Sequence, residues 1–519
     1  MVGVEAMSAC HLWGCFVQTV DQYPDRQAII RGDSSSTFSQ LHDLAVRYSD
    51  WLASLGVCFG DRVLLWMQGS SDMAAIMLAI WRLGAIVTLM DPDAKASHLE
   101  HAVEVASPKL ILRTPDRMLP CEIDVCEVRS IEELPQDPAR SAAAAVLPTD
   151  PASIVFTSGS TGKPKGVTQS HRNLIGGCLA VGSYLGYGHD ERIVSPVPWS
   201  FDYGYGQVLT TLITGATHII PNALNPFAIC EAIDRHQPTV FPGIPSIFSY
   251  LVQGMSPFPG LDKSSIRVVT NTGGTIPSPI LRRLFELFPE DQSRFFLNYG
   301  LTETYRSAYL PPEFARAKPT SIGSGIPGVH IVVVREDGTQ ASHGEIGEIV
   351  HRGAYQCLGY WNNPEATART LRPDPLAASG HPGQPTAVYT GDLGMFDDEG
   401  HLYYKGRRDQ QIKSMGVRVN PGEIEELLWA SGLVKEVAVF SMPNDLIGDE
   451  IWAAVVGKET NDGLQGRLVR YARTSMSPYM IPRRWLIKEA LPKTRTGKTD
   501  YPALKIEAAA DPSASVLGS

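Results

Sequence analysis

The chain has 519 residues, of which 43% are hydrophobic and 19% are charged, and these values are ordinary for a folded, water-soluble protein. Its 45 basic and 55 acidic side chains give a formal net charge of −10, which disfavours nucleic acid as the main partner because a polyanion would be repelled. The eight cysteines form no C-x-x-C pair and no zinc-like spacing, and the N-terminus has no basic segment followed by an apolar one. We therefore expect a cytoplasmic protein.

The first part of the chain, before Pro151, alternates between helical and strand-like segments. The sequence SQLHDLAVRYSDWLASLG is typical of a helix, and DRVLLWM, which follows it, is typical of a strand. The most apolar segment, MAAIMLAIWRLGAIVTLM from Met73, contains Arg82 and leads into Asp-Pro-Asp. It is predicted to be a buried helix followed by a strand, and not a membrane span. This alternation predicts sheets covered by helices.

The middle of the chain continues the pattern after a segment rich in proline, alanine and serine. A strand is expected over Ser153–Phe156, then a glycine-rich loop, then a helix from His171. Strands are also predicted in IRVVTNTGG, RFFLNYG, HIVVVRED and EIGEIVHRG. The proline- and glycine-rich sequence from Leu371 is expected to be a surface segment.

The last part of the chain repeats the alternation on a smaller scale after Gly406. A helix in PGEIEELLWASG precedes strands in EVAVFS and IWAAVVG, and a second helix follows in GLQGRLVRYARTS. These elements predict a second domain of roughly a hundred residues, which is within the usual size range of a domain. The predicted fold is therefore α/β, with a large N-terminal domain of layered sheets and helices and a small α+β C-terminal domain.

The loop TSGSTGKPKGV, residues 157–167, combines three glycines, four hydroxyl side chains and two lysines. Glycines allow a tight turn that exposes backbone N–H groups, and hydroxyls and a lysine add donors and charge, so this composition predicts a phosphate-binding loop. It is not the G-x-x-x-x-G-K-[ST] loop, because Lys163 is followed by Pro164. The predicted phosphate ligands are Thr157, Ser158, Gly159, Ser160, Thr161, Gly162 and Lys165.

One further motif, LGAIVTLMDP, begins at Leu83, before the loop. The others come after it, in the order NTGG from Asn271, NYGLTET from Asn298, YTGDLG from Tyr389, GRRDQQIKSMGVRVNPGEIE from Gly406 and PKTRTGK from Pro492. Together with the loop they resemble the adenylate-forming superfamily, which includes acyl-CoA synthetases, adenylation domains of peptide synthetases and luciferases. The resemblance extends from about Leu83 to Lys498. It implies a large domain over 1–405, a hinge over 406–409 and a mobile domain over 410–506, and the composition of the remaining tail, 507–519, predicts disorder.

The chemistry that the resemblance implies has two steps. A carboxylate attacks the α-phosphate of ATP to form an acyl adenylate, and a nucleophile then displaces AMP. The resemblance places Tyr299 against adenine, Thr302 at the α-phosphate and Glu303 on Mg²⁺, and Asp392 suits the ribose hydroxyls as a double acceptor. The remaining nucleotide-binding residues implied are Gly273, Gly274, Thr275, Asn298, Gly300 and Arg407.

Three further roles in the second domain come from the same resemblance. Lys498 is implied to bridge the substrate carboxylate and the α-phosphate, and so to be catalytic together with Thr302 and Glu303. Asp409 corresponds to the hinge between the domains. Lys413 and Gly416 match the segment that faces the incoming thiol after the small domain rotates.

The predicted acyl pocket comprises Phe201, Asp202, Gly206, Thr272 and Arg306. Many acyl-CoA synthetases have a histidine where Phe201 stands, and the Phe201-Asp202 pair is closer to amino-acid-activating domains, whose aspartate pairs with an ammonium group. In one interpretation Asp202 and Arg306 neutralise each other and leave a pocket for an acid without an amine. In the other, Arg306 receives a second carboxylate and Asp202 receives an amine. We prefer the acyl interpretation.

The acceptor is expected to be separate from this sequence, since no carrier-protein sequence follows Lys498. The resemblance allows CoA, the phosphopantetheine thiol of a separate acyl or peptidyl carrier protein, or an amine, as in an amide synthetase. A free-standing amino-acid adenylation enzyme, a luciferase-like oxygenase and a non-catalytic ATP-binding scaffold are the alternatives. The joint presence of Thr302, Glu303, Asp392 and Lys498 argues against the scaffold.

Overall fold

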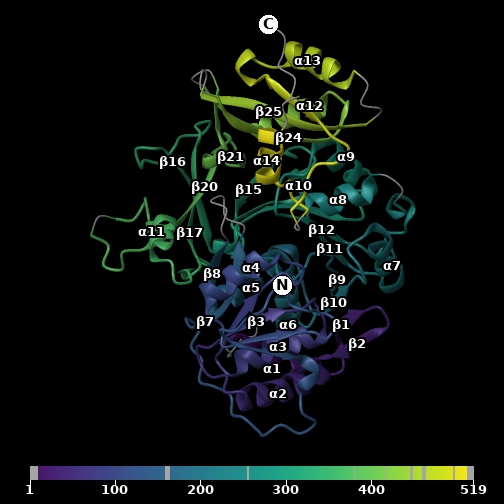
Figure 1. Cartoon of the computed structure of the whole chain (residues 1–519), viewed down its shortest axis with the longest axis vertical. Coiled ribbons are helices and arrows are strands. Elements are labelled where there is room, and N and C mark those ends of the chain that lie inside the picture. The colour runs from purple at the N-terminus through teal and green to yellow at the C-terminus, as the bar shows by residue number, and fades with distance from the viewer. Residues whose placement is uncertain are drawn as a thin grey trace.

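The computed structural model describes residues 10–157, 164–253, 256–378, 380–414, 417–444, 448–458, 463–494 and 497–510. These residues form four sheets, two in a large N-terminal domain and two in a small C-terminal domain. Figure 1 shows the C-terminal elements at one end of the long axis and the N-terminal helices at the other. The predicted α/β class, with a large and a small domain, is confirmed.

The largest sheet holds fourteen described strands. Its central strands run parallel and are almost fully buried, which fits their short apolar sequences. In order along the sheet the strands are β16 (Val329–Val334), β17 (Gly347–Gly353), β20 (Thr386–Phe396), β21 (Leu402–Arg407), β15 (Ser321–Gly325), β14 (Ala308–Leu310), β13 (Arg294–Tyr299), β12 (Val268–Asn271), β11 (Val240–Gly243), β9 (Arg192–Val194), β10 (Thr217–Ile220), β1 (Gln27–Arg31) and β2 (Ser34–Thr37). A further strand, β19 (Leu371–Pro373), pairs with β20.

The second sheet has seven described strands and carries the predicted phosphate loop between two of them. In order they are β18 (Gly359–Tyr360), β8 (Lys165–Ser170), β7 (Pro151–Thr157), β4 (Ile86–Leu89), β3 (Arg62–Trp66), β5 (Leu110–Arg113) and β6 (Glu127–Ser130). The helices of the large domain are α1 (Leu12–Gln22), α2 (Phe38–Ser54), α3 (Ser71–Arg82), α4 (Ala96–Ala106), α5 (His171–Leu185), α6 (Asp202–Thr214), α7 (Pro226–His236), α8 (Pro245–Val252), α9 (Ser278–Leu287), α10 (Pro312–Ala315) and α11 (Pro364–Thr370).

Helix α5 contributes to two hydrophobic cores. Cys178 packs in the core that α1, α2 and α3 share with the seven-stranded sheet, whereas Val181 and Leu185 pack in a core on the fourteen-stranded sheet. The helix begins where the Ser170 side chain accepts a hydrogen bond from the Asn173 N–H, as an N-cap residue does. Helices α5 and α6 therefore form a buried layer between the two sheets.

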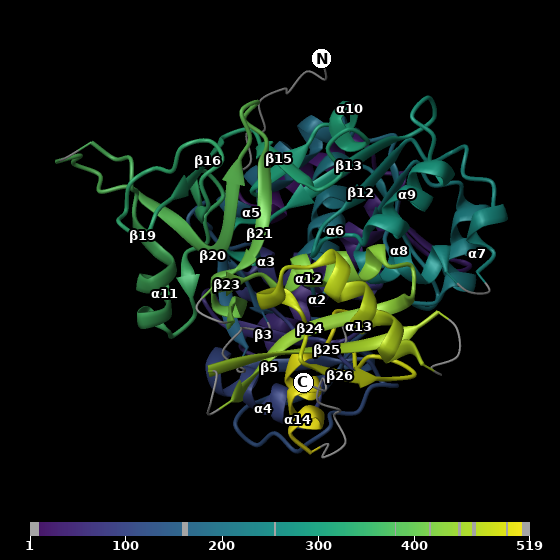
Figure 2. The ribbon, with the colours of Figure 1, turned by 90° about the horizontal axis from the view of Figure 1, so that it is seen from above.

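The small domain is a three-stranded sheet with helices on both faces, preceded by a two-stranded ribbon. Helices α12 (Pro421–Ala430) and α13 (Leu464–Ser475) cover one face of the sheet, and α14 (Tyr501–Ala510) covers the other. Its strands are β22 (Ile412–Ser414), β23 (Val417–Val419), β24 (Val434–Asn444), β25 (Gly448–Gly457) and β26 (Arg484–Ile487). Viewed from above, this domain lies in front of the large one (Figure 2).

One prediction about the elements needs correction. The tail was expected from residue 507, but α14 continues to Ala510 because Leu504 and Ala508 are buried against the small sheet. The segment from Leu371 lies at the surface, as predicted, since none of its described residues up to 385 is buried, and it begins with strand β19, which pairs with β20. Within the described residues, no helix combines the length and the apolar character needed to cross a membrane.

Candidate active site

Two of the predicted motifs lie at the carboxyl ends of neighbouring parallel strands. Strand β12 ends at Asn271 and β13 ends at Tyr299, with Asn271 beside Leu297 in the register. Ligands of open α/β sheets bind at this edge. Gly273 and Gly274 follow β12 with φ values of 81° and 159°, which side chains rarely adopt, so glycine is required there by the turn itself. Thr275, the next residue, is exposed.

A buried carboxylate, Asp392, lies beside the end of β13. It is 4% exposed, accepts a 2.6 Å hydrogen bond from the Tyr299 hydroxyl and lies 3.1 Å from the Arg407 guanidinium. Burial and the adjacent carboxylate raise the pKa of Tyr299 well above its ordinary value, so its phenol is neutral and donates. Three predicted nucleotide-binding residues from β13, β20 and β21 are thus in direct contact.

Glu303, in the 3₁₀ turn η3 (Thr302–Thr304), is held by a residue that the sequence did not indicate. The Tyr360 hydroxyl on β18 donates a 2.6 Å hydrogen bond to Glu303 Oε1, and the Lys165 ammonium lies 5.2 Å from the centre of the Tyr360 ring. The Gln169 side chain on β8 donates to the Thr302 carbonyl. The seven-stranded sheet therefore supports the turn that carries the predicted catalytic residues.

The phosphate loop connects β7 and β8, which pair in an antiparallel hairpin with Thr157 opposite Lys165. Residues 158–163, which include Ser158, Gly159, Ser160, Thr161 and Gly162, lie outside the described residues. Gly166 was predicted to help the turn. It lies instead within β8, where a Cβ would come 2.8 Å from a methyl group of Ile154, so close packing requires it.

Asn298 is bound by protein groups. Its Oδ1 accepts a 2.7 Å hydrogen bond from the Tyr184 hydroxyl, and its Nδ2 donates to the Asn271 carbonyl at 3.2 Å. Gly300 allows the chain to fold back, because a Cβ there would lie 3.0 Å from the Arg306 Cα. These two residues thus fix the backbone around the motif.

The predicted acyl-pocket residues lie around the start of α6. Phe201 is the N-cap residue of α6, and the Asp202 carboxylate accepts a 2.9 Å hydrogen bond from the Tyr203 N–H. Thr272 is buried beyond the end of β12. Asp202 forms no ion pair with a described residue, and neither does Arg306, so the predicted neutralisation of one by the other is wrong in this structure.

Gly206 was predicted to line the pocket, but the space beside it is occupied by Tyr305. A Cβ at Gly206 would lie 3.0 Å from the Tyr305 hydroxyl, and a Cβ at Gly177 on α5 would collide with the Tyr305 ring. Tyr305 has a φ of 57°, an unfavourable value for a residue with a side chain. Its ring packs between α5 and α6, where Gly177 and Gly206 have no side chains that would occupy the same space.

The residues predicted in the small domain are only partly described. Lys498 is exposed and forms no ion pair among the described residues, and its carbonyl accepts a 2.7 Å hydrogen bond from the Thr494 N–H. Gly497 packs against Ser246 on α8, so this loop contacts the large domain. Asp409 lies in the turn η4 (Arg408–Gln410) and Lys413 in β22, whereas Gly416 lies outside the described residues.

Comparison with known proteins identifies both domains. Residues 16–361 match the family of AMP-binding enzymes, and residues 423–498 match the AMP-binding enzyme C-terminal domain. Delta-poly-L-ornithine synthetase of Acinetobacter baumannii is 30% identical over 94% of this chain, which spans 36% of the length of that relative. L-proline--[L-prolyl-carrier protein] ligase of Pseudomonas fluorescens is 28% identical over 94% of this chain and 97% of its own.

A solved structure gives the same result. The o-succinylbenzoate CoA synthetase of Bacillus subtilis, in complex with its acyl-adenylate intermediate, superposes with a TM-score of 0.83 at 25% identity. The match covers 95% of this chain and 98% of that one. The chain belongs to the AMP-binding enzyme family, within the adenylate-forming superfamily that its motifs resemble.

Proposed function

We propose that the protein is an AMP-forming ligase, which activates a carboxylic acid with ATP and passes the acyl group to a thiol. The observation that supports this most directly is the contact of Asp392 with Tyr299 and Arg407 beside the Thr302–Glu303 turn. Tyr299 ends β13 and Arg407 ends β21, whereas Asp392 lies within β20, so three strands of the same sheet contribute to this contact. The family match over residues 16–361 supports the same function.

In this proposal Asp392 binds the ribose of ATP. A carboxylate has about four lone pairs, so it accepts hydrogen bonds from the ribose hydroxyls while it keeps its bond from Tyr299. Arg407 provides the counter-charge of this carboxylate, at a distance of 3.1 Å. The Tyr299 ring lies against adenine, and the loop after β7 surrounds the phosphates together with Lys165.

Glu303 is the proposed protein ligand of Mg²⁺. A single carboxylate fits this ion, because Mg²⁺ in nucleotide sites takes one or two carboxylates and completes its shell with phosphates and water. Within the described residues, no group of three or more histidine, cysteine, aspartate or glutamate side chains could hold a metal ion. The ion would neutralise phosphate charge, while Tyr360 orients the Glu303 carboxylate.

The first half-reaction joins a carboxylate oxygen of the acid to the α-phosphorus of ATP, and the bond to the bridging oxygen of pyrophosphate breaks. Thr302 donates to the α-phosphate, and Lys498 stabilises the charge that develops between the two reactants. In the second half-reaction the thiol sulfur attacks the acyl carbon, the acyl–phosphate oxygen bond breaks, AMP leaves and the thiol proton passes to solvent. Asp409 is the proposed hinge for rotation between the steps, with Lys413 and Gly416 facing the thiol.

We place the domain boundary at residues 406–409, with the adenylation domain before it and the mobile domain after it. The acceptor thiol is CoA or a separate carrier protein.

ATP–pyrophosphate exchange tests the proposal. Purified protein is assayed with MgATP, labelled pyrophosphate and two pools, one of carboxylic acids without an amine and one of α- and β-amino acids. Exchange that requires an acid supports the function. ATP binding without exchange in either pool contradicts it and favours a binding role.

A second candidate is a free-standing amino-acid adenylation enzyme. The observation that favours it is the absence of an ion-pair partner for Asp202 among the described residues, since a substrate ammonium would provide one. Exchange confined to the amino-acid pool, and lost in Asp202→Asn, would select this candidate over the acyl ligase.

A further inference from the structure

Arg306 is a buried cation without a counter-charge. It is 6% exposed, its Nε has no hydrogen-bond partner, and its guanidinium forms no ion pair with a described residue. Its guanidinium carbon lies 5.1 Å from the centre of the Tyr203 ring. A cation–π contact offsets only part of the cost of burying a charge, because a buried ion without a counter-charge loses most of its hydration.

The tyrosines around Arg306 do not supply the missing anion. The Tyr184 hydroxyl donates to Asn298, and the Tyr203 hydroxyl is bonded to Thr270, so both are already used. Burial raises the pKa of Tyr203 to about 12, although the nearby guanidinium opposes this shift. These phenols therefore stay neutral at physiological pH, and the positive charge of Arg306 is not compensated by a phenolate.

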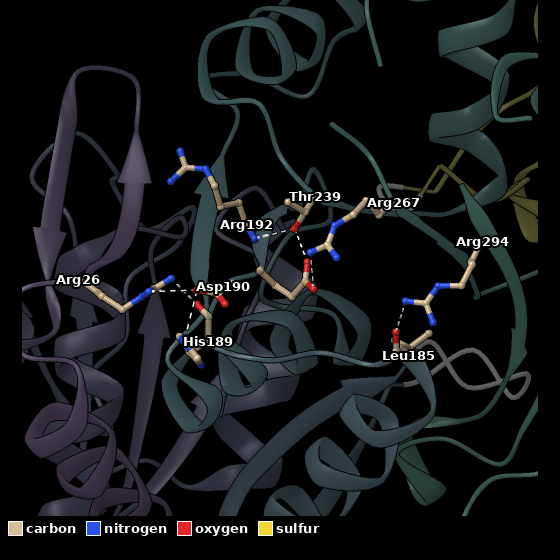
Figure 3. Close-up of polar contacts among 9 residues, drawn as sticks. Arg26, Leu185, His189, Asp190, Arg192, Thr239, Arg267 and Arg294 are labelled. Atoms are coloured by element: carbon tan, nitrogen blue, oxygen red, sulfur yellow. Dashed lines mark hydrogen bonds and ion pairs between the residues drawn. The ribbon is translucent and has the colours of Figure 1, made fainter. Parts of the chain in front are cut away.

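Three other arginines, which stand at or just before the starts of β1, β12 and β13, do have protein partners. Arg267 lies 2.9 Å from the buried Glu191 carboxylate, Arg26 donates to the His189 carbonyl at 2.6 Å, and Arg294 donates to the Leu185 carbonyl at 2.9 Å (Figure 3). Each has an evident structural partner. Arg306, which is more buried than these, has none among the described residues.

The backbone directs Arg306 away from the nucleotide side of the site. Glu303 contacts Tyr360 on the seven-stranded sheet, whereas Arg306 contacts Tyr203 on α6. The change of direction occurs at Tyr305, whose positive φ is fixed by its ring between α5 and α6. Tyr203 is part of α6, so the guanidinium packs against the helix that also carries Asp202 and Gly206, two of the residues predicted to bind the acyl group.

We propose that Arg306 binds a second acidic group of the acid substrate, so that the protein activates dicarboxylic acids or acids with another anionic oxygen group. The inference rests on the proposed acid-activating function. One carboxylate of the substrate reacts with ATP, and the other forms a bidentate pair with the planar guanidinium in a site that excludes water. The ligand thus supplies the counter-charge that the described protein residues do not.

Matched acids test this inference by ATP–pyrophosphate exchange. The wild-type protein is assayed with succinate against butyrate, glutarate against pentanoate and phthalate against benzoate. We expect at least one dicarboxylate to give a kcat/KM about 100-fold above its partner, the size of one lost charge-assisted pair. Equal values, or a preference for monocarboxylates in every pair, would overturn the inference but leave acid activation intact.

The variants separate recognition from structure. Arg306→Gln should raise the KM of the preferred dicarboxylate about 100-fold with little change in the KM of ATP, and should favour its half-amide. Arg294→Gln, at the other end of β13, is the matched control and should leave the preference unchanged. A rise in the KM of ATP with no change in acid preference would show that Arg306 serves the phosphates, and would contradict the inference.

Thermal unfolding decides the matter without a known substrate. Removing a buried charge without a counter-charge removes its desolvation cost from the folded state, so Arg306→Met should raise Tm by a few degrees in the absence of ligands. If Arg306 were instead paired with an anionic group of the protein, its removal would lower Tm. A fall in Tm would therefore overturn the inference. If no acid supports exchange, the proposed function fails, and the direction of this shift still reports on Arg306.

Discussion

Tyr360 binds two of the predicted nucleotide-binding residues through different parts of its side chain. Its hydroxyl donates to Glu303, and its ring faces the Lys165 ammonium. Burial and the Glu303 carboxylate raise its pKa well above the ordinary value, so the hydroxyl remains a donor at any physiological pH. Tyr360 is thus a positioning residue: its hydroxyl orients the Glu303 carboxylate, and its ring contacts the Lys165 ammonium.

Replacing Tyr360 with phenylalanine separates these two contacts. Tyr360→Phe keeps the ring beside Lys165 but removes the hydrogen bond to Glu303, and we expect kcat/KM for MgATP to fall about 10-fold, as for the loss of one bond to a charged group. The Mg²⁺ concentration for half-maximal exchange should rise in parallel. Titration of Mg²⁺ at fixed ATP measures this, and an unchanged requirement would refute the link to Glu303.

Lys498 offers a second test at the scale of a single residue. It is exposed and lies in a loop whose backbone is held by Thr494, so its side chain contributes little to folding. Lys498→Ala should bind ATP like the wild type but lose most pyrophosphate release, because its proposed role is to stabilise the charge that develops in the first half-reaction. Stopped-flow or phosphate-coupled detection of pyrophosphate checks this, and release at the wild-type rate would remove Lys498 from the first half-reaction.

At the scale of elements, Glu425 joins three parts of the small domain. The carboxylate, on α12, accepts 2.8 Å hydrogen bonds from the Val439 N–H of β24 and from the Tyr501 hydroxyl of α14. Burial raises the pKa of Glu425 to about 7 from the ordinary value of 4.5. The folded state therefore binds a proton that the unfolded state has lost between these two pH values, and stability falls as the pH rises through this window.

Glu425→Gln should remove this pH dependence, because the amide oxygen accepts the same bonds without charge. We expect the variant to match the wild type near pH 4.5 and to become more stable than it as the pH rises towards 7, with a constant difference of about 3 kcal/mol above that. Thermal unfolding of both proteins between pH 5 and 9 measures the difference. A gap that does not change with pH would show that Glu425 is ionised throughout.

The elements also show what the sequence could and could not predict. Regular periodicity predicted α12, β24, β25 and α13, and the long helix α5. Strand β8 was missed because its sequence, KGVTQS, is polar and follows a loop, and it forms only through pairing with β7 and β18. Local patterns carry no information about such partners.

The same limit applies to the site. The motifs at the ends of β12 and β13 could be placed from sequence, since carboxyl ends of parallel strands share an edge. Tyr360 and Tyr305 could not, because their roles depend on contacts with Glu303 and with the helix glycines, respectively. The pairing of Asp202 with Arg306 was predicted from proximity along the pocket alone and is not formed.

At the scale of the whole molecule, the small domain contacts the large one at separate points. The Ser278 hydroxyl on α9 donates to Glu426 on α12 at 2.9 Å, and Gly497 packs on Ser246. The turn between the domains is anchored on one side, where Arg408 lies 2.9 Å from the buried Glu348 carboxylate. Rotation of the small domain would break the first two contacts while Arg408 remains fixed, so the change in backbone angles would fall on the residues after it.

A proline in this turn tests the proposed hinge. Asp409→Pro fixes φ near −65° and should hinder rotation, so thioester formation should fall at least 10-fold more than pyrophosphate release. Asp409→Ala, which removes the side chain but leaves φ free, is the control. Single-turnover measurements of the two half-reactions provide the comparison, and an equal loss in both would place the hinge elsewhere.

The packing of Tyr305 between α5 and α6 has a consequence for how this protein could acquire a new substrate during evolution. Any larger residue at Gly177 or Gly206 meets the Tyr305 ring, and any smaller residue at Tyr305 leaves a void between α5 and α6. Each single step is therefore unfavourable, whereas a smaller residue at 305 combined with a larger one at 206 preserves the total volume. Specificity in this lineage is expected to change through coupled pairs of substitutions, and libraries that vary these three positions together would reach variants that stepwise selection does not.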